Sequence, residues 1–362
     1  MLALRRCGPT PVRCCDRCVL AEQLVAAAQT GQVGQVRNIL TSSLTGVDAS
    51  TPNSEGFTAL VMAAEEGHVE VAELLIAAGA DKGCSANDAC PLVRAAGRGH
   101  LNMVAELLRT GADVEDREDG CPAIVMAARH GHDEVVSALA GAHADLEAKD
   151  ATGCTAMMAA SATGQSQVVQ ILLQRGARPG TSATQGHALS LATLGNHLET
   201  AALLIKTRDV DVDLGDEKHR AALSFAAERN LVTMGKLLLG ARAEVDHADD
   251  AGDTPLVWAC RCRAEDMVEL LLQHKARVNH LDARGRSPVM QAAALAHPGI
   301  VTALLEARAE VNLRDGRQWP PLAYAYQAKE DTREMLTDKA AVLKLLLGAR
   351  ADADLVPFAP DE

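Results

Sequence analysis

A seven-residue phrase recurs at intervals of 32 to 34 residues along almost the whole of this 362-residue chain. Its first clear copy reads Thr58-Ala-Leu-Val-Met-Ala-Ala, and a later one reads Thr254-Pro-Leu-Val-Trp-Ala-Cys. Copies start at Thr58, Cys90, Pro122, Thr155, His187, Ala221, Thr254, Ser287 and Pro320, and those at His187 and Ala221 are weaker. Such a period indicates stacked copies of one supersecondary unit rather than a single thick-cored globular domain.

Each unit is predicted to be a pair of short helices. Proline at the second position of several phrases suits the first turn of a helix, where its missing N–H group is harmless. A second apolar phrase follows at helical spacing, as in Val71-Ala-Glu-Leu-Leu-Ile-Ala-Ala-Gly79. Its terminal glycine suits a left-handed C-cap. A Gly-His step, as at Gly67-His68, lies between the two phrases.

These two phrases closely resemble the ankyrin-repeat family, and the resemblance covers roughly residues 20–352. It implies an all-α solenoid of about ten helix-turn-helix units, with protruding β-turns at Asp-Gly stretches such as Asp315-Gly316. We expect an array over residues 21–352, a disordered Cys- and Arg-containing tail at 1–20 and a C-terminal tail at 353–362. Insertions fall near residues 41–51, 206–217 and 330–338, and the last is expected to be a solvated helix extension.

The later units depart from the glycine C-cap. Where Gly79, Gly111 and Gly176 stand, they carry His143, Arg242, Lys275, Arg308 and Arg350. A left-handed non-glycine residue costs roughly 1 kcal/mol, and a cation at a helix C-terminus recovers about 0.3–1 kcal/mol. We therefore interpret these residues as structural, and a basic docking stripe along them is the alternative.

The amino-acid composition and net charge limit the classes of partner that the protein can bind. Aromatic residues make up 2% of the chain, which favours thin layers of Ala- and Leu-rich helices over an aromatic core. The net charge of −13 argues against nucleic acid and against an anionic membrane surface. No apolar run reaches the length of a membrane-spanning helix. The N-terminal arginines resemble a transit peptide only weakly, so the expected location is the cytoplasm, with the nucleus as alternative.

The ten cysteines are too sparse for a disulfide scaffold, so we expect reduced thiols. Cys84, Cys90, Cys121 and Cys154 fall at or beside the β-turns, where they could be partly exposed. Four further cysteines lie near the N-terminus, namely Cys7, Cys14, Cys15 and Cys18. They could share a zinc ion or be modified, although we favour the interpretation that they belong to an ordinary tail.

Several strings imitate functional motifs without completing them. His130-Gly-His132-Asp133-Glu134 places His132 at the ordinary step between helices, and no His-Glu-x-x-His is present. A calcium loop starting at Asp209 would have Leu214 where glycine is required. Gly235-Lys236 lacks the preceding glycine of a phosphate loop. We therefore predict no cofactor, no metal and no catalysis, because the residues outside the array are too few for a catalytic domain.

The predicted function is protein binding, as an interaction module or scaffold, with a regulatory or targeting subunit of an enzyme complex as the alternative. The family resemblance implies a concave face made by turn tips and first helices. Trp258 occupies a leucine slot of a first helix and is expected in the core, whereas Trp319 follows a turn tip. With nearby arginines Trp319 would form a basic, aromatic edge that suits an acidic peptide segment. The candidate binding residues are Arg261, Arg263, Arg284, Arg286, Arg314, Arg317 and Trp319. Light scattering is expected to show a monomer.

Overall fold

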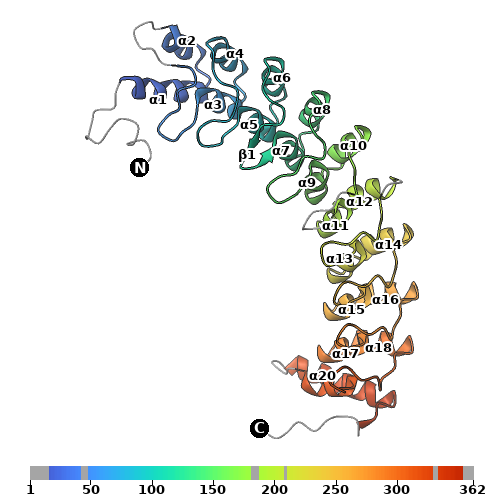
Figure 1. Ribbon diagram of the computed structural model, residues 1–362. Coiled ribbons are helices and arrows are strands. Elements are labelled where there is room, and N and C mark those ends of the chain that lie inside the picture. The colour runs from blue at the N-terminus through green and yellow to red at the C-terminus, as the bar shows by residue number, and fades with distance from the viewer. Residues whose placement is uncertain (1–15, 42–47, 181–186, 208–209, 329–332, 354–362) are drawn as a thin grey trace. The chain divides into compact units, whose positions relative to one another are not determined.

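The computed structural model describes residues 16–41, 48–180, 187–207, 210–328 and 333–353. The described chain consists of twenty helices and one two-stranded hairpin, and it divides into two compact units, residues 1–179 and 180–362. Figure 1 shows paired helices stacked one after another within each unit. This confirms the predicted all-α architecture of about ten helix pairs.

Unit 1 contains ten helices and the hairpin. The helices are α1 (Asp16–Gln29), α2 (Val33–Thr41), α3 (Ala59–Glu66), α4 (Val69–Ala77), α5 (Pro91–Arg98), α6 (Leu101–Arg109), α7 (Ala123–His130), α8 (Asp133–Gly141), α9 (Ala156–Thr163) and α10 (Ser166–Gln174). Strands β1 (Arg117–Glu118) and β2 (Cys121–Pro122) pair antiparallel, with Arg117 opposite Pro122. Helix α1 begins ahead of residue 21, the predicted start of the array.

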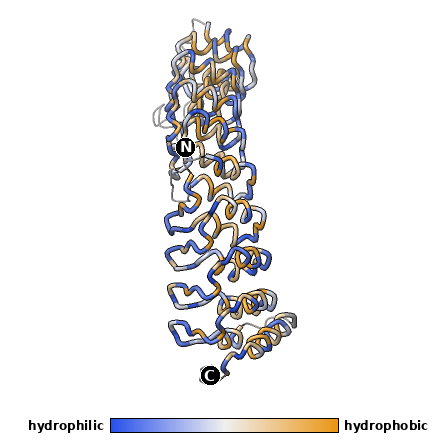
Figure 2. Tube along the Cα trace, turned by 90° about the vertical axis from the view of Figure 1, so that its right-hand side faces the viewer, coloured by the Kyte–Doolittle hydropathy of each residue, from blue (hydrophilic) through white to orange (hydrophobic). Residues whose placement is uncertain are grey.

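Unit 2 contains the other ten helices. They are α11 (Ala188–Leu194), α12 (Leu198–Ile205), α13 (Ala222–Glu228), α14 (Val232–Gly240), α15 (Pro255–Arg261), α16 (Glu265–Gln273), α17 (Pro288–Ala294), α18 (Pro298–Glu306), α19 (Pro321–Gln327) and α20 (Arg333–Gly348). In Figure 2 the hydrophilic turns of this unit protrude beyond its more hydrophobic helices. Helix α20 has 16 residues, so the predicted insertion lengthens it, and residues 329–332 lie outside the description.

Within each unit the odd-numbered helices pack on one another, and so do the even-numbered helices. We call these two layers the odd row and the even row. Where a phrase carries an alanine pair, both side chains are buried in the odd row, as at Ala63, Ala64, Ala95 and Ala96, which are fully buried. Small side chains there allow the close helix spacing that the aromatic-poor composition predicted.

In unit 1 the histidines of the Gly-His steps connect each repeat to the preceding repeat. The Nε2 atoms of His68, His100 and His132 lie 3.1, 2.9 and 3.0 Å from carbonyl oxygens of the preceding repeat. His132 therefore has the structural place that its position in the repeat predicted.

All five non-glycine C-cap residues adopt the predicted left-handed conformation. Their φ angles lie between 65° and 69° at His143, Arg242, Lys275, Arg308 and Arg350. Gly176 has the same role with φ 90°, and a Cβ atom added there would meet nothing within 4 Å. A side chain at this position therefore destabilises the protein through the left-handed backbone conformation and not through a steric clash.

We expect Arg308→Gly to raise the free energy of unfolding by about 0.5 kcal/mol. Glycine removes the strain of the left-handed conformation, and loss of the favourable interaction between the cation and the helix C-terminus offsets part of this stabilisation. The reverse change Gly176→Ala should lower the free energy of unfolding by about 1 kcal/mol. Urea denaturation checks both values. Lower stability of the glycine variant would show that Arg308 makes a further stabilising contact.

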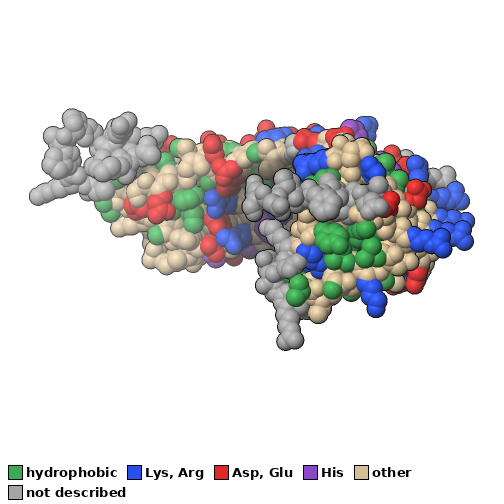
Figure 3. Space-filling view, turned by 90° about the horizontal axis from the view of Figure 1, so that it is seen from below, with side chains coloured by type: hydrophobic (Ala, Val, Ile, Leu, Met, Phe, Trp, Pro, Cys, Tyr) green, Lys and Arg blue, Asp and Glu red, His purple; other side chains and the backbone are tan. Residues whose placement is uncertain are grey.

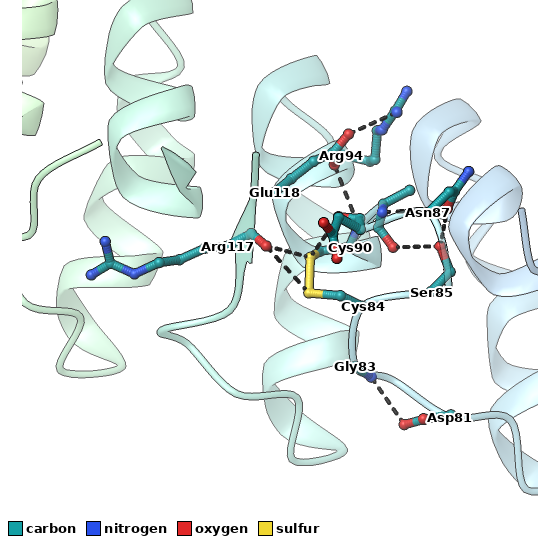
Figure 4. The surroundings of a disulfide bond; sticks show 11 residues. Asp81, Gly83, Cys84, Ser85, Asn87, Cys90, Arg94, Arg117 and Glu118 are labelled. Atoms are coloured by element: carbon teal, nitrogen blue, oxygen red, sulfur yellow. Dashed lines mark hydrogen bonds and ion pairs between the residues drawn. A yellow bond between two sulfur atoms is a disulfide. The ribbon is translucent and has the colours of Figure 1, made fainter. Parts of the chain in front are cut away.

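The structure corrects the expectation of reduced thiols at the second turn. Cys84 and Cys90 form a disulfide there, and both sulfur atoms lie near the Arg117 carbonyl oxygen, at 3.4 and 3.0 Å (Figure 4). The two cysteines meet because the turn folds back on itself, with Ser85 N–H donating to the Ala89 carbonyl at 2.8 Å. Sequence spacing did not reveal this closure, since only the folded turn brings the two residues together.

The other turn cysteines differ from one another. Cys121 is buried, so the expectation of a partly exposed thiol is wrong for it. Cys154 is half-buried, and burial raises the pKa of its thiol to about 11. Of the N-terminal cysteines only Cys18, in α1, lies within the described residues.

Candidate functional site

The turns are held by a side-chain oxygen at their first residue. In six turns the Oδ1 atom of the first residue accepts hydrogen bonds from the backbone N–H groups of the residues two and four positions later in the chain. These first residues are Asn53, Asp150, Asp216, Asp249, Asp282 and Asp315. Asx residues favour such turns because their short side chains satisfy the backbone locally. The turn tips are therefore preorganised.

In unit 2 the second carboxylate oxygen ties the turn to the odd row. Trp258 Nε1 donates to Asp249 Oδ2 at 3.0 Å, and the Tyr324 hydroxyl donates to Asp315 Oδ2 at 2.6 Å. In both pairs the donor stands nine residues after the carboxylate, at the fifth position of the repeated phrase. The aromatic side chains of that position are thereby oriented toward the turns.

Protonation states support this arrangement. Burial alone would raise the pKa of Asp315, but hydrogen bonds from the Tyr324 hydroxyl and from the Trp319 and Arg317 N–H groups hold it below its usual value. Burial and the bond to Asp315 raise the pKa of Tyr324 to about 12. The carboxylate is thus ionised and the phenol protonated at neutral pH.

The fifth phrase positions of α13 and α15 carry Phe225 and Trp258, with an arginine between their rings. The Arg220 guanidinium carbon lies 4.1 Å from the Phe225 ring centroid and 3.7 Å from that of Trp258. Arg261 contacts the Trp258 ring from 4.8 Å. Cation–π contacts of this kind stabilise both partners.

The expectation that Trp258 is a core residue is therefore wrong. Its ring is only partly buried, because it lies on the surface of α15 between two arginines and donates to Asp249. Trp319 is also half-buried and meets Tyr324 edge-to-face, with 5.7 Å between ring centroids.

The predicted arginines divide into two groups. Arg261 pairs with Asp253 at 2.6 Å and Arg286 pairs with Asp282 at 2.7 Å, so both charges are compensated. The other four are exposed and have no ion pair within the part of the chain that the structure describes: Arg263, Arg284, Arg314 and Arg317. We call these four residues the arginine group. Arg284 and Arg317 stand on successive turn tips, while Arg263 follows the end of α15.

The comparable surface of unit 1 is internally compensated. Arg94 bridges Glu65 and Glu118 at 3.1 and 2.7 Å, and Arg98 also contacts Glu65, at 2.6 Å. Although burial alone would raise the pKa of Glu65, these arginines hold it below its usual value. The arginines of α5 therefore differ from the arginine group of unit 2 in having carboxylate partners.

Aromatic side chains recur along the turns and odd row of unit 2, and we call Phe225, Trp258, Trp319 and Tyr324 the aromatic row. The low overall aromatic fraction of the chain conceals this concentration, of which the sequence indicated only Trp319. Five of the seven aromatic residues nevertheless fall within about one hundred residues, namely Phe225, Trp258, Trp319, Tyr324 and Tyr326. Aligning the fifth position of each phrase would have revealed part of this concentration.

Two further features bear on the site. Among the described residues there is no group of three potential metal ligands. No described helix combines the length and apolar character needed to traverse a bilayer.

A family model matches the sequence of this chain. The family model described as "Ankyrin repeats (3 copies)" matches residues 24–118, 92–183 and 223–315, which together cover more than half of the chain. A search of curated proteins found no match. The extent of the model match and the stacked helix pairs lead to one conclusion: the chain belongs to the ankyrin-repeat family.

Proposed function

We propose that this protein binds an acidic segment of a partner protein along the turn tips and odd row of unit 2. Ankyrin repeats are generally protein–protein interaction modules, and no catalytic domain is identified within the matched residues. The observation that carries the proposal is the arginine group beside the aromatic row. Exposed cations that have no ion pair among the described residues favour carboxylates over other ligands.

The aromatic side chains would supply the apolar part of the interaction. Tryptophan, tyrosine and arginine are the residue types enriched in interface hot spots. Trp258, Trp319 and Tyr324 are all held by neighbours before a partner arrives. Such preorganisation lowers the entropy lost on binding. Arg261 and Arg286 would act mainly by positioning, since their charges are already paired.

The test is a selection of random twelve-residue peptides displayed on phage against the full chain. We expect enrichment of peptides rich in Asp and Glu, and we expect Arg284→Glu/Arg317→Glu to weaken binding of a selected synthetic peptide 10- to 100-fold. Each reversed contact should contribute about 1 kcal/mol or more. Because both tryptophans of the chain lie in this region, their fluorescence should change on titration.

The matched control is Lys206→Glu/Lys236→Glu, which makes the same change of charge at exposed residues of the even-row side of unit 2. It should reduce affinity by less than threefold at physiological salt, where distant charges are screened. Selected peptides without excess acidic residues would contradict the proposal, as would equal losses in both double variants.

A further inference from the structure

Successive turn tips of unit 2 are joined by backbone hydrogen bonds. In three neighbouring pairs of turns, an N–H group of the later turn donates to a carbonyl oxygen of the earlier turn at 2.9 to 3.0 Å; the pairs are Asp250–Lys218, Ala283–Ala251 and Gly316–Arg284. Glycine permits this close approach, since a Cβ atom added to Gly285 would lie 3.0 Å from the Gly316 nitrogen. The backbones of neighbouring tips are therefore in direct contact.

The last of these contacts makes two arginines neighbours. Arg317 directly follows Gly316, whose N–H group donates to the Arg284 carbonyl oxygen. Chains joined by such a bond lie about 5 Å apart. Both arginine side chains are exposed, and we call these two residues the arginine pair. Further Lys and Arg side chains lie at the margin of the α20 end of unit 2, which Figure 3 views.

The carboxylates of the same two turns have other partners. Asp282 accepts from two N–H groups of its turn and from the Arg286 guanidinium. Asp315 accepts from two N–H groups of its turn and from the Tyr324 hydroxyl. Arg317 helps to lower the pKa of Asp315, yet within the described residues neither member of the arginine pair makes an ion pair. Like charges on neighbouring chains repel, so an anion between them would stabilise the tips.

The chemistry of the arginine pair favours a phosphoryl group over a carboxylate. A guanidinium presents its N–H groups in a planar fork that binds two oxygens of one anion. A carboxylate has two oxygens and a single charge, so one guanidinium is enough to pair with it. A phosphorylated side chain has three terminal oxygens and a charge of about −1.5 to −2 at pH 7. It therefore matches two neighbouring guanidinium groups in both charge and acceptor number.

We propose that the acidic segment bound by unit 2 carries a phosphorylated residue whose phosphoryl group lies between Arg284 and Arg317. This inference rests on the proposed function, because the same turn tips and the aromatic row would bind the rest of the segment. Trp319 stands two residues after Arg317 and packs edge-to-face on Tyr324, so an apolar surface lies beside the arginine pair. The net charge of −13 disfavours an anionic membrane as the source of the phosphoryl group.

Binding of the full chain to arrays of twelve-residue peptides tests the proposal. The central residue is phosphoserine, phosphotyrosine or glutamate, and the flanking residues vary. The best phosphorylated peptide should bind about 10- to 100-fold more tightly than its glutamate counterpart, because a second charge-assisted contact is added. Acidic peptides that gain nothing from phosphorylation would overturn this inference and leave the proposed function standing. Absence of binding to every peptide would overturn both.

Lysine variants separate the shape of the guanidinium from its charge. Arg284→Lys/Arg317→Lys keeps both charges but removes both forks, so the preference for phosphate over glutamate should fall below about threefold. Affinity for the glutamate peptide should change little. The matched control is Arg308→Lys, at an exposed residue after even-row helix α18, which should retain the full preference. An undiminished preference in the double variant would contradict the proposal.

The pH dependence of binding needs no variant. The second pKa of a phosphoryl group is about 6, so affinity for the phosphorylated peptide should rise about fourfold between pH 5.5 and 7.5. Affinity for the glutamate peptide should stay nearly constant, since glutamate is already ionised at pH 5.5. Phosphatidylcholine vesicles that contain a phosphoinositide are the final arm. Binding to these vesicles without any preference for phosphorylated peptides would assign the arginine pair to a lipid headgroup and overturn the proposal.

Discussion

Lowering the pH from 7.5 to 5.0 should destabilise unit 2 by about 2 kcal/mol through a single residue, His187. This histidine is the N-cap of α11 and is fully buried. Its Nδ1 lies 3.2 Å from Ser190 Oγ, and its Nε2 has no hydrogen-bond partner within the described residues. Burial lowers the pKa of His187 to about 4, although Asp211 acts in the opposite direction.

The direction of the effect follows from proton linkage. The unfolded chain binds a proton near pH 6.5, whereas the folded chain does so only near pH 4, so acid favours the unfolded state. The stability contributed by the neutral imidazole is fully present above pH 6.5 and is lost as the pH falls through 4. Integration gives a loss of about 2 kcal/mol at pH 5 and about 3 kcal/mol at pH 4.

His187→Thr isolates this contribution. Threonine occupies the same position in three other repeats, where Thr58, Thr155 and Thr254 accept a hydrogen bond from the third residue of the helix. Urea midpoints followed by tryptophan fluorescence report on unit 2, which holds both tryptophans. The variant should lose about 2 kcal/mol less than the parent between pH 7.5 and pH 5.

The control histidine is His219, whose side chain is 74% exposed and pairs with Asp250. His219→Asn should leave the pH dependence unchanged within about 0.5 kcal/mol, because exposed ion pairs contribute little. Equal acid sensitivity of His187→Thr and the parent would show that the loss arises at other groups.

The fold could be predicted from the sequence because its determinants are local and repeated. Phrases such as that at Thr58 carry the helix start, the alanine pair and the following glycine within about 20 residues. Even the left-handed Arg308 was predictable, since its position in the repeat forces that conformation whatever its side chain. Each repeat contacts mainly its neighbours, so nothing distant needed to be inferred.

The site was less predictable because side-chain environment depends on pairs from different elements. Trp258 looked like a core residue in a leucine slot, but Asp249 and two arginines hold it at the surface. From the sequence alone, Arg284 and Arg286 were equally good candidates for binding residues. Only the fold shows that Arg286 pairs with Asp282 while Arg284 has no ion pair within the described residues.

Asp282→Ala should be the most damaging single change in the turns of unit 2. The Asp282 side chain is 1% exposed. Its Oδ1 accepts from the N–H groups of Arg284 and Arg286, both at 2.8 Å, and its Oδ2 accepts from the Arg286 guanidinium. Alanine would leave two turn N–H groups without an acceptor and Arg286 without its counter-ion.

We expect a loss of about 3 kcal/mol in the free energy of unfolding, because removing one member of a buried ion pair leaves the other charge uncompensated. The figure lies at the low end of the usual range since the Arg286 side chain is 22% exposed. Asp282→Asn should lose less, as its amide oxygen can still accept the backbone bonds. Urea denaturation followed by tryptophan fluorescence checks both variants.

Asp250→Ala is the matched control in the neighbouring turn. Its side chain is 60% exposed and pairs with an exposed histidine, so its loss should change stability by no more than about 0.5 kcal/mol. Because Asp282 also fixes the turn that carries Arg284, Asp282→Ala should weaken binding of an acidic peptide even where the chain remains folded. Unchanged stability would show that water replaces the carboxylate at the turn, and the preorganised tip on which the binding proposal depends would then lose its physical basis.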